Sequence, residues 1–537
     1  MGKTEKKSFV KGAAILGIAG LLCKIIGALF RIPLRNLMGV AGMTYYSTVY
    51  PYYSWLLVVS SSGLPTAISK LVSERVTLGD YAGAKRVFRK SLLLLTVIGL
   101  VTTALMFFGA DALAQVTNCP GAEKSFRALA PALFFVSVMC AYRGYLQGLQ
   151  QMTGTAMSQL TEQAGKLIIS LLLVRILLPR GYDVAAMGAL LGITASEILA
   201  LIVIFLFYLL HQKTDPGFRS AKDLVEERGN DHTIRDILVI AIPVTIGASI
   251  MPLTGIVDTL LIKNIMLSTG FSREYADMCF AVFRTDVSTI INMPAVLTVA
   301  LAMSLVPAIS AACTRNDRIG VQRVSRMGLK LALIVGLPCA VGLYVIGGQV
   351  IEFLFKVTPE ELTIGTALMK SSAVGIIFLS LVQTMTGCLQ GCGRPLIPVI
   401  NLGAGAVVKI VVMAVLMFDP ALNIQGASIS TVACYAVAGI LDLVYLIRLT
   451  GMRVSIWDCF GKPIVASLAM GGAVYFAGAF LKNHVGSTAA TLGSVAVGVV
   501  IYGALVIALR MFSTEELAFI PGGARLRGLL GRKGERA

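Results

Sequence analysis

The sequence predicts an all-α polytopic membrane protein with about fourteen transmembrane helices, built as two six-helix lobes in parallel repeat plus two extra C-terminal helices. Three observations support this fold class. The 537-residue chain is 56% hydrophobic and only 14% charged, with a mean hydropathy of +0.82. Apolar runs long enough to cross a bilayer as helices recur along the chain, whereas the alternating pattern of membrane β-strands is missing. Finally, two stretches of the first half recur in the second.

The first apolar run follows a cationic start, MGKTEKKSFVKG. We expect this run to be an uncleaved first helix, because it is too long for a signal peptide and has no convincing small-residue cleavage site. The later runs complete the series, and the predicted spans are 8–38, 44–70, 88–114, 126–149, 160–178, 186–210, 235–266, 276–310, 327–355, 366–390, 396–418, 424–448, 462–481 and 488–511.

An internal repeat relates the two halves of the chain. The tripeptide Leu-Gln-Gly at 146–148 recurs at 389–391, an offset of 243 positions (389 − 146), within longer similar segments. A second match pairs the segment that begins at Pro65 with the one that begins at Pro307. Because each half holds an even number of helices, both halves enter the membrane from the same side and the repeat is parallel.

The repeat and the charge distribution divide the chain into five parts. The predicted parts are an N-terminal lobe at 1–210, a cytoplasmic linker at 211–234, a C-terminal lobe at 235–450, a pair of extra helices at 451–512 and a basic cytoplasmic tail at 513–537.

Lysine and arginine concentrate in alternate loops, which predicts that both termini lie in the cytoplasm. This bias and attraction to anionic membrane lipids account for much of the net charge of +18, so no nucleic-acid partner is needed. The cation-rich segments begin near Lys3, Arg75, Lys213, Arg315 and Arg525.

The ten cysteines fall mostly in or beside apolar runs, where we expect them to pack as small apolar side chains. Cys388 and Cys392 share a helical face, but no histidine accompanies them, so a metal site there is not expected. We find no catalytic set of carboxylates or histidines and no glycine-rich nucleotide loop. The sequence therefore predicts a transporter that is not an enzyme, has no resident cofactor and is a monomer.

Three cations lie on one stripe of the first predicted helix. At 100° per residue, Arg31 and Arg35 each lie about 20° from Lys24 around the helix axis, on opposite sides of it. Such charges are costly in lipid, so they must face protein or water. The alternative for Arg31 and Arg35 is that they reach the outer headgroups. We predict that the stripe lines a cavity and binds an anionic substrate. Replacing Lys24, Arg31 or the Arg284 of a later span is expected to abolish transport but to leave folding intact.

Further cations lie inside other predicted spans. Arg284 is expected to join the first-helix stripe, with an ion pair to another helix as the alternative. Lys409 has no partner nearby in sequence and is also predicted to bind substrate. Lys166 follows Glu162 by four residues, a spacing that favours a local ion pair. A cavity with several Lys and Arg side chains suits a pyrophosphate group.

Asp258 is an acidic residue inside the seventh predicted span. One interpretation makes it a binding site for a coupling Na⁺ ion, together with Asn401 on the eleventh span. The other interpretation is an ion pair with Lys263 or another basic residue. We expect transport to be driven electrochemically, by the membrane potential alone or together with Na⁺.

The first, second, seventh and eighth predicted helices are long and contain prolines. Proline removes a backbone donor and bends a helix. We predict that these helices act as gates, with bending at Pro51, Pro65, Pro252, Pro294 and Pro307.

Two segments carry a family resemblance. KGAAILGIAGLLCKIIGALFRIPLRNLMGVAG and GLPTAISKLVSERVTLGDYAGAKRVFRKSL resemble the lipid II flippases and stage V sporulation protein B-like members of the multidrug/oligosaccharidyl-lipid/polysaccharide exporter superfamily. The resemblance covers essentially the whole chain. One departure is that YYSWLLVVSSSGLP, in the second helix, lacks the basic residue found in some flippases.

The resemblance implies an alternating-access flippase in the bacterial plasma membrane. Its substrate would be lipid II, the undecaprenyl-pyrophosphate-linked precursor of peptidoglycan, moved from the inner to the outer leaflet for cell wall or spore synthesis. By the resemblance Lys24, Arg31 and Arg284 take the positions of cavity cations, and the last two helices shape a groove for the polyprenyl tail.

Three other functions stay open. The chain could export another polyprenyl-linked polysaccharide unit, or it could be a cation-coupled multidrug antiporter, which would need acidic cavity residues. A scaffold that transports nothing is the third alternative.

Overall fold

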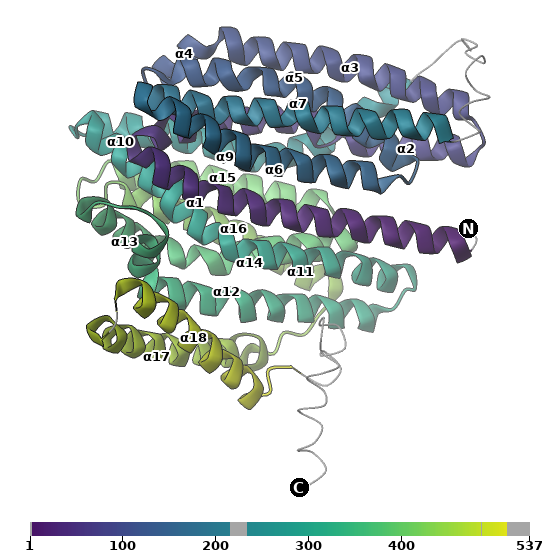
Figure 1. The fold of residues 1–537 in the computed structure, drawn as a ribbon. Helices are drawn as coiled ribbons and strands as arrows, with labels where there is room; N and C mark the ends of the chain where they lie inside the picture. Colours follow the sequence, from purple (N-terminus) through teal and green to yellow (C-terminus); the bar gives the residue numbers. More distant parts are fainter. Residues whose placement is uncertain (1–2, 215–232, 485, 513–537) are drawn as a thin grey trace. The chain divides into compact units, whose positions relative to one another are not determined.

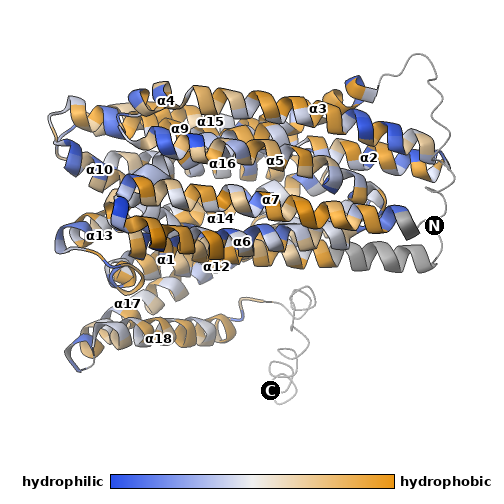
Figure 2. Ribbon diagram, turned by 45° about the horizontal axis from the view of Figure 1, so that its top comes forward, coloured by the Kyte–Doolittle hydropathy of each residue, from blue (hydrophilic) through white to orange (hydrophobic). Residues whose placement is uncertain are grey.

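The computed structural model describes residues 3–214, 233–484 and 486–512, and within these ranges it contains helices and no strands (Figure 1). Eleven helices are long and apolar enough to cross a membrane, or twelve if one bent pair counts as a single span. Figure 2 shows hydrophobic residues along most of the long helices and hydrophilic residues mainly near their ends. The chain is thus a multi-pass helical membrane protein.

The count of about fourteen spans is not confirmed, and two features account for the difference. The candidate Ile15–Thr77 is 63 residues long and covers two predicted spans. Its first helix, α1 (Lys3–Ser61), is interrupted at Gly39, where the backbone has φ 64° and ψ −170°. Helix α6 (Met152–Leu177) is not among the candidates, because charged residues interrupt its apolar run.

The structure groups the chain into two compact units. Met1–Thr285 and Met417–Ile424 form the first, and Asp286–Leu416 and Gln425–Ala537 form the second. This grouping does not follow the predicted lobe boundaries, which stay a prediction. Most of the predicted linker, residues 215–232, and the predicted tail, residues 513–537, lie outside the described residues.

Helices α1 and α6 of the first unit have been bounded above. Its other elements are α2 (Leu64–Thr77), α3 (Tyr81–Phe108), α4 (Ala110–Val116), α5 (Ala122–Gly148), the 3₁₀ turn η1 (Leu178–Arg180), α7 (Tyr182–Thr214), α9 (Thr233–Ser268), α10 (Arg273–Ala281) and most of the π-helical segment η2 (Val282–Val287).

Small residues let the helices of this unit approach closely. Helix α5 packs between α3 and α7, as Figure 1 shows. At the α6–α7 contact, a Cβ on Gly192 would lie 2.5 Å from the backbone of Ser170, and a Cβ on Gly165 would lie 2.9 Å from Ser196. Such contacts between glycine and serine are typical of helix packing in membranes, where close backbone approach replaces the hydrophobic effect as the driving force.

Helices α1 and α2 are separated by a break at Ser62 and Gly63. Pro65 follows this break in the first turn of α2, where its missing N–H removes no helical hydrogen bond. A Cβ on Gly63 would lie 2.2 Å from the carbonyl oxygen of Ala241 in α9. The chain at this break therefore packs directly against the backbone of α9.

The opposite end of α9 is also tied to the N-terminal helices. Lys263 of α9 forms a 2.7 Å ion pair with Asp277 of α10. The backbone carbonyl of Asp277 accepts a hydrogen bond of 3.2 Å from Thr44 of α1. Helix α9 thus packs against the start of α2 near one end and is linked through α10 to α1 near the other.

The second unit consists of the remaining helices. They are α11 (Ser288–Thr314), α12 (Arg318–Leu354), α13 (Pro359–Ala373), α14 (Gly375–Gly391), α15 (Leu396–Met417), α16 (Gln425–Thr450), the π-helical segment η3 (Trp457–Gly461), α17 (Lys462–His484) and α18 (Ser487–Ala508). Helices α13 and α14 meet at a bend of 45°, within a range where the sequence predicts one helix.

Candidate functional site

A small cavity in the first unit is the candidate site. Its volume is about 20 Å³, which is enough for one water molecule. Its lining comes from α1 and η2 and comprises Arg31, Met43, Tyr46, Ser47, Tyr50, Pro51, Arg284 and Thr285. Two of the predicted substrate-binding cations therefore share one wall.

Aromatic residues of α1 hold the first of these cations. Tyr46 and Tyr50 are stacked with ring centroids 5.4 Å apart, one helical turn from each other. The guanidinium of Arg31 lies 5.8 Å from the centroid of the Tyr50 ring, within the range of a cation–π contact. The fixed rings thereby limit the positions that the Arg31 side chain can take.

Lys166 of α6 contacts the same tyrosine. Its ammonium donates a 3.3 Å hydrogen bond to the Tyr50 hydroxyl and lies 4.9 Å from the centroid of that ring. It also lies 5.2 Å from the centroid of Phe30. Lys166 is therefore a third cation next to the cavity.

The predicted pair between Glu162 and Lys166 is wrong. Glu162 instead forms a 3.0 Å ion pair with Arg143 of α5, and the Arg143 guanidinium also donates to Ser158 at 2.8 Å. The packing of α5 on α6 brings a stronger, forked donor to Glu162 than its neighbour in sequence. This leaves the Lys166 ammonium to Tyr50.

Arg284 lies on η2, a π-helical segment, and such segments occur often at functional sites. Its guanidinium forms a 3.2 Å ion pair with Asp258 of α9, whose side chain is 3% exposed. A Cβ on Gly255 of α9 would lie 3.2 Å from the Arg284 guanidinium and 3.4 Å from Pro51. The glycine therefore makes room for the arginine where α9 meets α1. Both alternatives for Arg284 hold, since it lies beside Arg31 and also has an acidic partner.

The charge at this cavity is positive. Within the described part of the chain, Arg31 and Lys166 have no carboxylate oxygen within 4.0 Å. The lining residues include two arginines and no carboxylate. The hydroxyls of Ser47 and Thr285, 3.1 Å apart, add neutral donors. The wall is thus suited to an anion with several oxygen atoms.

The other predicted substrate-binding residues lie elsewhere. Lys24 is exposed, about 10 Å along α1 from Arg31 at 1.5 Å per residue, and does not line the cavity. Arg35 is 1% exposed, so it is buried in protein and does not reach the surface. Lys409 is buried on α15 in the second unit. Their role in binding stays a prediction.

The two residues of the predicted sodium site have other partners. Asp258 pairs with Arg284, which is the second interpretation made for it. Asn401 of α15 donates a 2.7 Å hydrogen bond to Asp442 of α16. The described residues contain no group of three or more His, Cys, Asp or Glu side chains suited to a metal ion. A sodium site at these residues stays a prediction.

The predicted gating prolines lie within long helices, except for Pro65 in the first turn of α2. Pro51 is inside α1, Pro252 is inside α9, and Pro294 and Pro307 are inside α11. Of these, Pro51 lines the cavity. Bending at these positions stays a prediction.

The sequence analysis did not assign Lys166, Tyr46, Tyr50 or Ser47 to the cavity. The segment YYSTVYPYY, residues 45–53, carries a signal for three of them. Tyr46 and Tyr50 are four residues apart and therefore share a helical face, and a run of hydroxyl groups in a membrane span requires polar partners.

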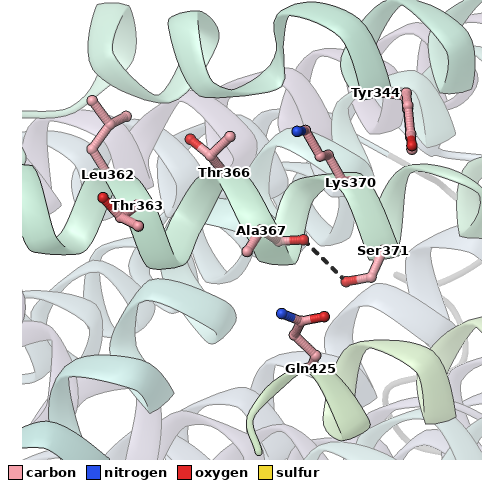
Figure 3. A pocket seen from close by; sticks show the side chains of 8 residues that line it. All are labelled: Tyr344, Leu362, Thr363, Thr366, Ala367, Lys370, Ser371 and Gln425. Atoms are coloured by element: carbon pink, nitrogen blue, oxygen red, sulfur yellow. Dashed lines mark hydrogen bonds between the residues drawn. The ribbon is translucent and has the colours of Figure 1, made fainter. Parts of the chain in front are cut away.

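Two larger hollows suit a pyrophosphate less well. A groove of about 730 Å³ in the second unit is lined by α12, α13 and α16, with Lys370 as the one cation among its lining residues. Figure 3 shows Lys370 among neutral side chains, including Thr366 and Gln425. A second hollow, of about 670 Å³, contains Asp111 and Glu123 beside Arg273. Neither hollow gathers predicted site residues.

Comparison with known sequences reveals relatives along the whole chain. Residues 9–313 match the family model described as polysaccharide biosynthesis protein, and residues 285–415 match the MatE model. Stage V sporulation protein B of Bacillus subtilis (strain 168) is 25% identical, over 97% of this chain and 99% of its own. Lipid II flippase MurJ of the same organism is 24% identical, over 98% and 99%. The resemblance inferred from the sequence is confirmed.

Solved structures show the same fold. A lipid II flippase MurJ structure in an inward closed conformation has a TM-score of 0.67 at 16% identity, covering 93% of this chain and 99% of its own. An inward-facing multidrug resistance MATE family transporter has a TM-score of 0.68 at 16% identity, covering 80% and 94%. Both belong to classes of membrane transporter.

Proposed function

Because the chain belongs to the polysaccharide biosynthesis protein family, we propose that it is a flippase for polyprenyl-pyrophosphate-linked glycan precursors. Lipid II is the substrate we favour, since one full-length relative is named as a lipid II flippase. The headgroup would move from the inner to the outer leaflet of the plasma membrane, with both termini of the chain in the cytoplasm. Another polyprenyl-linked polysaccharide unit is the closest alternative substrate.

The observation that carries this proposal is the cationic wall around Tyr50. Arg31 and Lys166 contact the same ring from α1 and α6, and neither has a carboxylate partner among the described residues. Arg284 lines the same cavity and is paired with Asp258. An incoming anion can compete with Asp258 for the Arg284 guanidinium. A pyrophosphate would offer these three cations several charged oxygen acceptors at once.

The volume of the cavity requires a conformational change. A space for one water molecule cannot hold a pyrophosphate with its sugar, so α1 and η2 must separate before the substrate binds. We propose that the chain binds its substrate when the cavity is open and adopts the closed state with the small cavity only without substrate. The prolines of α1, α9 and α11 are the proposed bending points.

A multidrug antiporter for cations is the competing function. Such a carrier needs acidic groups that face its substrate, and the residues that line this cavity include two arginines and no carboxylate. A cationic drug would be repelled here, so the lining favours an anionic substrate. The structural similarity to a MATE transporter concerns the fold alone. The evidence on substrate charge is the set of residues that line the cavity.

A binding experiment tests the proposal. Thermal unfolding of the purified chain in detergent is measured with a short-chain polyprenyl pyrophosphate, with the matching monophosphate and with a cationic drug. We expect the pyrophosphate to raise the unfolding temperature most, because binding to the folded state stabilises it. The shift should shrink in Arg31→Gln and persist in Arg127→Gln, a control that removes an arginine from an exposed pair with Asp111. A larger shift with the drug would overturn the proposal.

A further inference from the structure

A second polar cluster lies behind the cavity, in the contact between α1, α5, α6 and α7. Its central residue is Glu197, which is 4% exposed and lies 15 residues after Tyr182 and 17 before Thr214, the two ends of α7. It is therefore near the middle of a helix that is long enough to cross the membrane.

The Glu197 carboxyl group is poorly satisfied. Its Oε1 accepts from the Tyr53 hydroxyl at 3.5 Å, the outer limit for a hydrogen bond. Its Oε2 has no hydrogen-bond partner within the described residues. An ionised carboxylate in this setting would carry a full charge away from water with a free oxygen, which is among the costliest arrangements in a protein interior.

The cations nearby are engaged with other groups. Those that act on Glu197 electrostatically are Arg143 of α5 and Lys166 of α6. Arg143 is paired with Glu162, and Lys166 donates to Tyr50 on the cavity side. Glu162 itself adds negative charge near Glu197. Among the described residues, Glu197 therefore has one long hydrogen bond from Tyr53 and no ion pair to stabilise its ionised form.

A short aromatic connection joins Glu197 to the cavity. Tyr53, the partner of Glu197, packs on Tyr50 with ring centroids 5.9 Å apart, and Tyr50 lines the cavity. The two tyrosines are three residues apart on α1 and share a face. A movement of α1 that opens the cavity therefore also moves the hydroxyl next to Glu197.

We propose that Glu197 is a proton-binding site that takes up a proton when the Arg31–Arg284 cavity closes and releases it when the cavity opens to water. Water supplies and receives the proton, and no other bond forms or breaks. The closed cavity is too small for a headgroup, so the protonated state belongs to the carrier without its substrate. The proton then moves on the return step, in the direction opposite to the lipid.

This coupling rests on the proposed flippase function, whereas proton binding by Glu197 does not. The first measurement is therefore independent of transport. Infrared spectra of the protein in bilayers at neutral pH should contain the C=O stretch of a protonated carboxylic acid, and this band should be lost in Glu197→Gln. Asp111→Asn is the control and should keep the band, because Asp111 forms an exposed ion pair with Arg127.

A second variant keeps the test decisive if Glu197→Gln folds poorly. Tyr53→Phe removes the hydroxyl that contacts Glu197 and should shift the carboxylic C=O band to higher frequency without abolishing it. A wild-type spectrum without such a band, or a band unchanged in Glu197→Gln, would overturn the proposal.

The coupling is tested in vesicles with the membrane potential held at zero. Flipping of a labelled polyprenyl-pyrophosphate lipid by the wild type should accelerate several-fold when the side that receives the headgroup is made acidic, and Glu197→Gln should not respond to the pH gradient. A wild type that flips the lipid equally fast at every gradient would refute the coupling. Absence of any flipping would count against the proposed function alone, since the infrared result does not depend on it.

Discussion

Residues at the cavity differ in how much folding stability is lost when each side chain is replaced. Arg31 and Lys166 contact aromatic rings and a hydroxyl, so their loss leaves no buried charge behind. Arg284 is different, because its loss leaves the carboxylate of Asp258, which is 2% exposed, without this cation. The expectation that all cavity cations can be replaced without affecting folding therefore does not extend to Arg284.

We predict that Arg284→Gln lowers the free energy of unfolding by roughly 3 kcal/mol, the lower end of the range for breaking a buried pair, since Arg284 is partly exposed. The double variant Arg284→Gln with Asp258→Asn should recover most of this loss, and flipping should be lost in both. Unfolding in detergent and lipid transport in vesicles provide the two measurements. A double variant as unstable as the single one would contradict the role assigned to the pair.

For Lys166 we predict a change in substrate binding with little change in stability. Lys166→Gln removes a cation next to the cavity, so the affinity for a polyprenyl pyrophosphate should fall about tenfold, the equivalent of one hydrogen bond to a charged group. Lys124→Gln is the control, because Lys124 pairs with Asp183 at an exposed site where such pairs contribute little. Equal affinity in the wild type and Lys166→Gln would exclude Lys166 from the site.

At the residue scale the sequence could identify cations but not all of their partners. Arg31 and Arg284 stand out because charges in apolar runs require a special environment. The partner of Glu162 could not be found in this way, since Arg143 reaches it through the packing of α5 on α6. Sequence spacing ranks contacts within one helix and carries no information on which helices are neighbours.

Helices and their interruptions determine how the cavity can open. Gly63 packs closely against the backbone of Ala241 in α9, within the break that separates α1 from α2. The other end is fixed by Lys263, Asp277 and Thr44. Opening toward one side of the membrane would break one of these two contacts, either that of Gly63 with α9 or the link through Asp277, and would keep the other.

Gly63→Ala should favour the state in which α2 and α9 are apart. The added Cβ would lie 2.2 Å from the carbonyl oxygen of Ala241. A flexible side chain could move away from such a clash, but the backbone of α9 cannot move without shifting the helix. Spin labels on the ends of α2 and α9 should report a longer distance than in the wild type, together with slower transport. Gly472→Ala is the control, since a Cβ there meets nothing within 4 Å. An unchanged distance in Gly63→Ala would argue against a gate at this contact.

At the element scale, hydropathy predicted where helices lie but not how they are interrupted. The gap between spans 8–38 and 44–70 agrees with the break at Gly39, because glycine tolerates a positive φ angle. The π-helical segment that carries Arg284 and the bend between α13 and α14 were not predicted. Both depend on tertiary packing, which leaves no periodic signal in the sequence.

On the scale of the whole molecule, the account describes a carrier driven by an electrochemical gradient. A unit charge that crosses the membrane with a moving cavity is worth about 2.3 kcal/mol per 100 mV. The inside-negative potential therefore favours the inward return of the cationic wall. We expect flipping in vesicles to slow several-fold when the potential is clamped to zero, with a further dependence on Na⁺ only if Asp258 and Asn401 form a site. A rate indifferent to both would contradict an electrochemical drive.

The central claim is that the wall formed by Arg31, Lys166 and Arg284 moves a pyrophosphate-linked lipid across the bilayer. The most direct measurement is transport of a fluorescent polyprenyl-pyrophosphate-linked glycan in vesicles that contain only the purified chain, with Arg31→Gln and the exposed-site control Arg127→Gln side by side. We expect rapid flipping by the wild type and the control and loss of flipping in Arg31→Gln. Flipping at the wild-type rate by Arg31→Gln, or no flipping by a folded wild type under an imposed potential, would contradict the account.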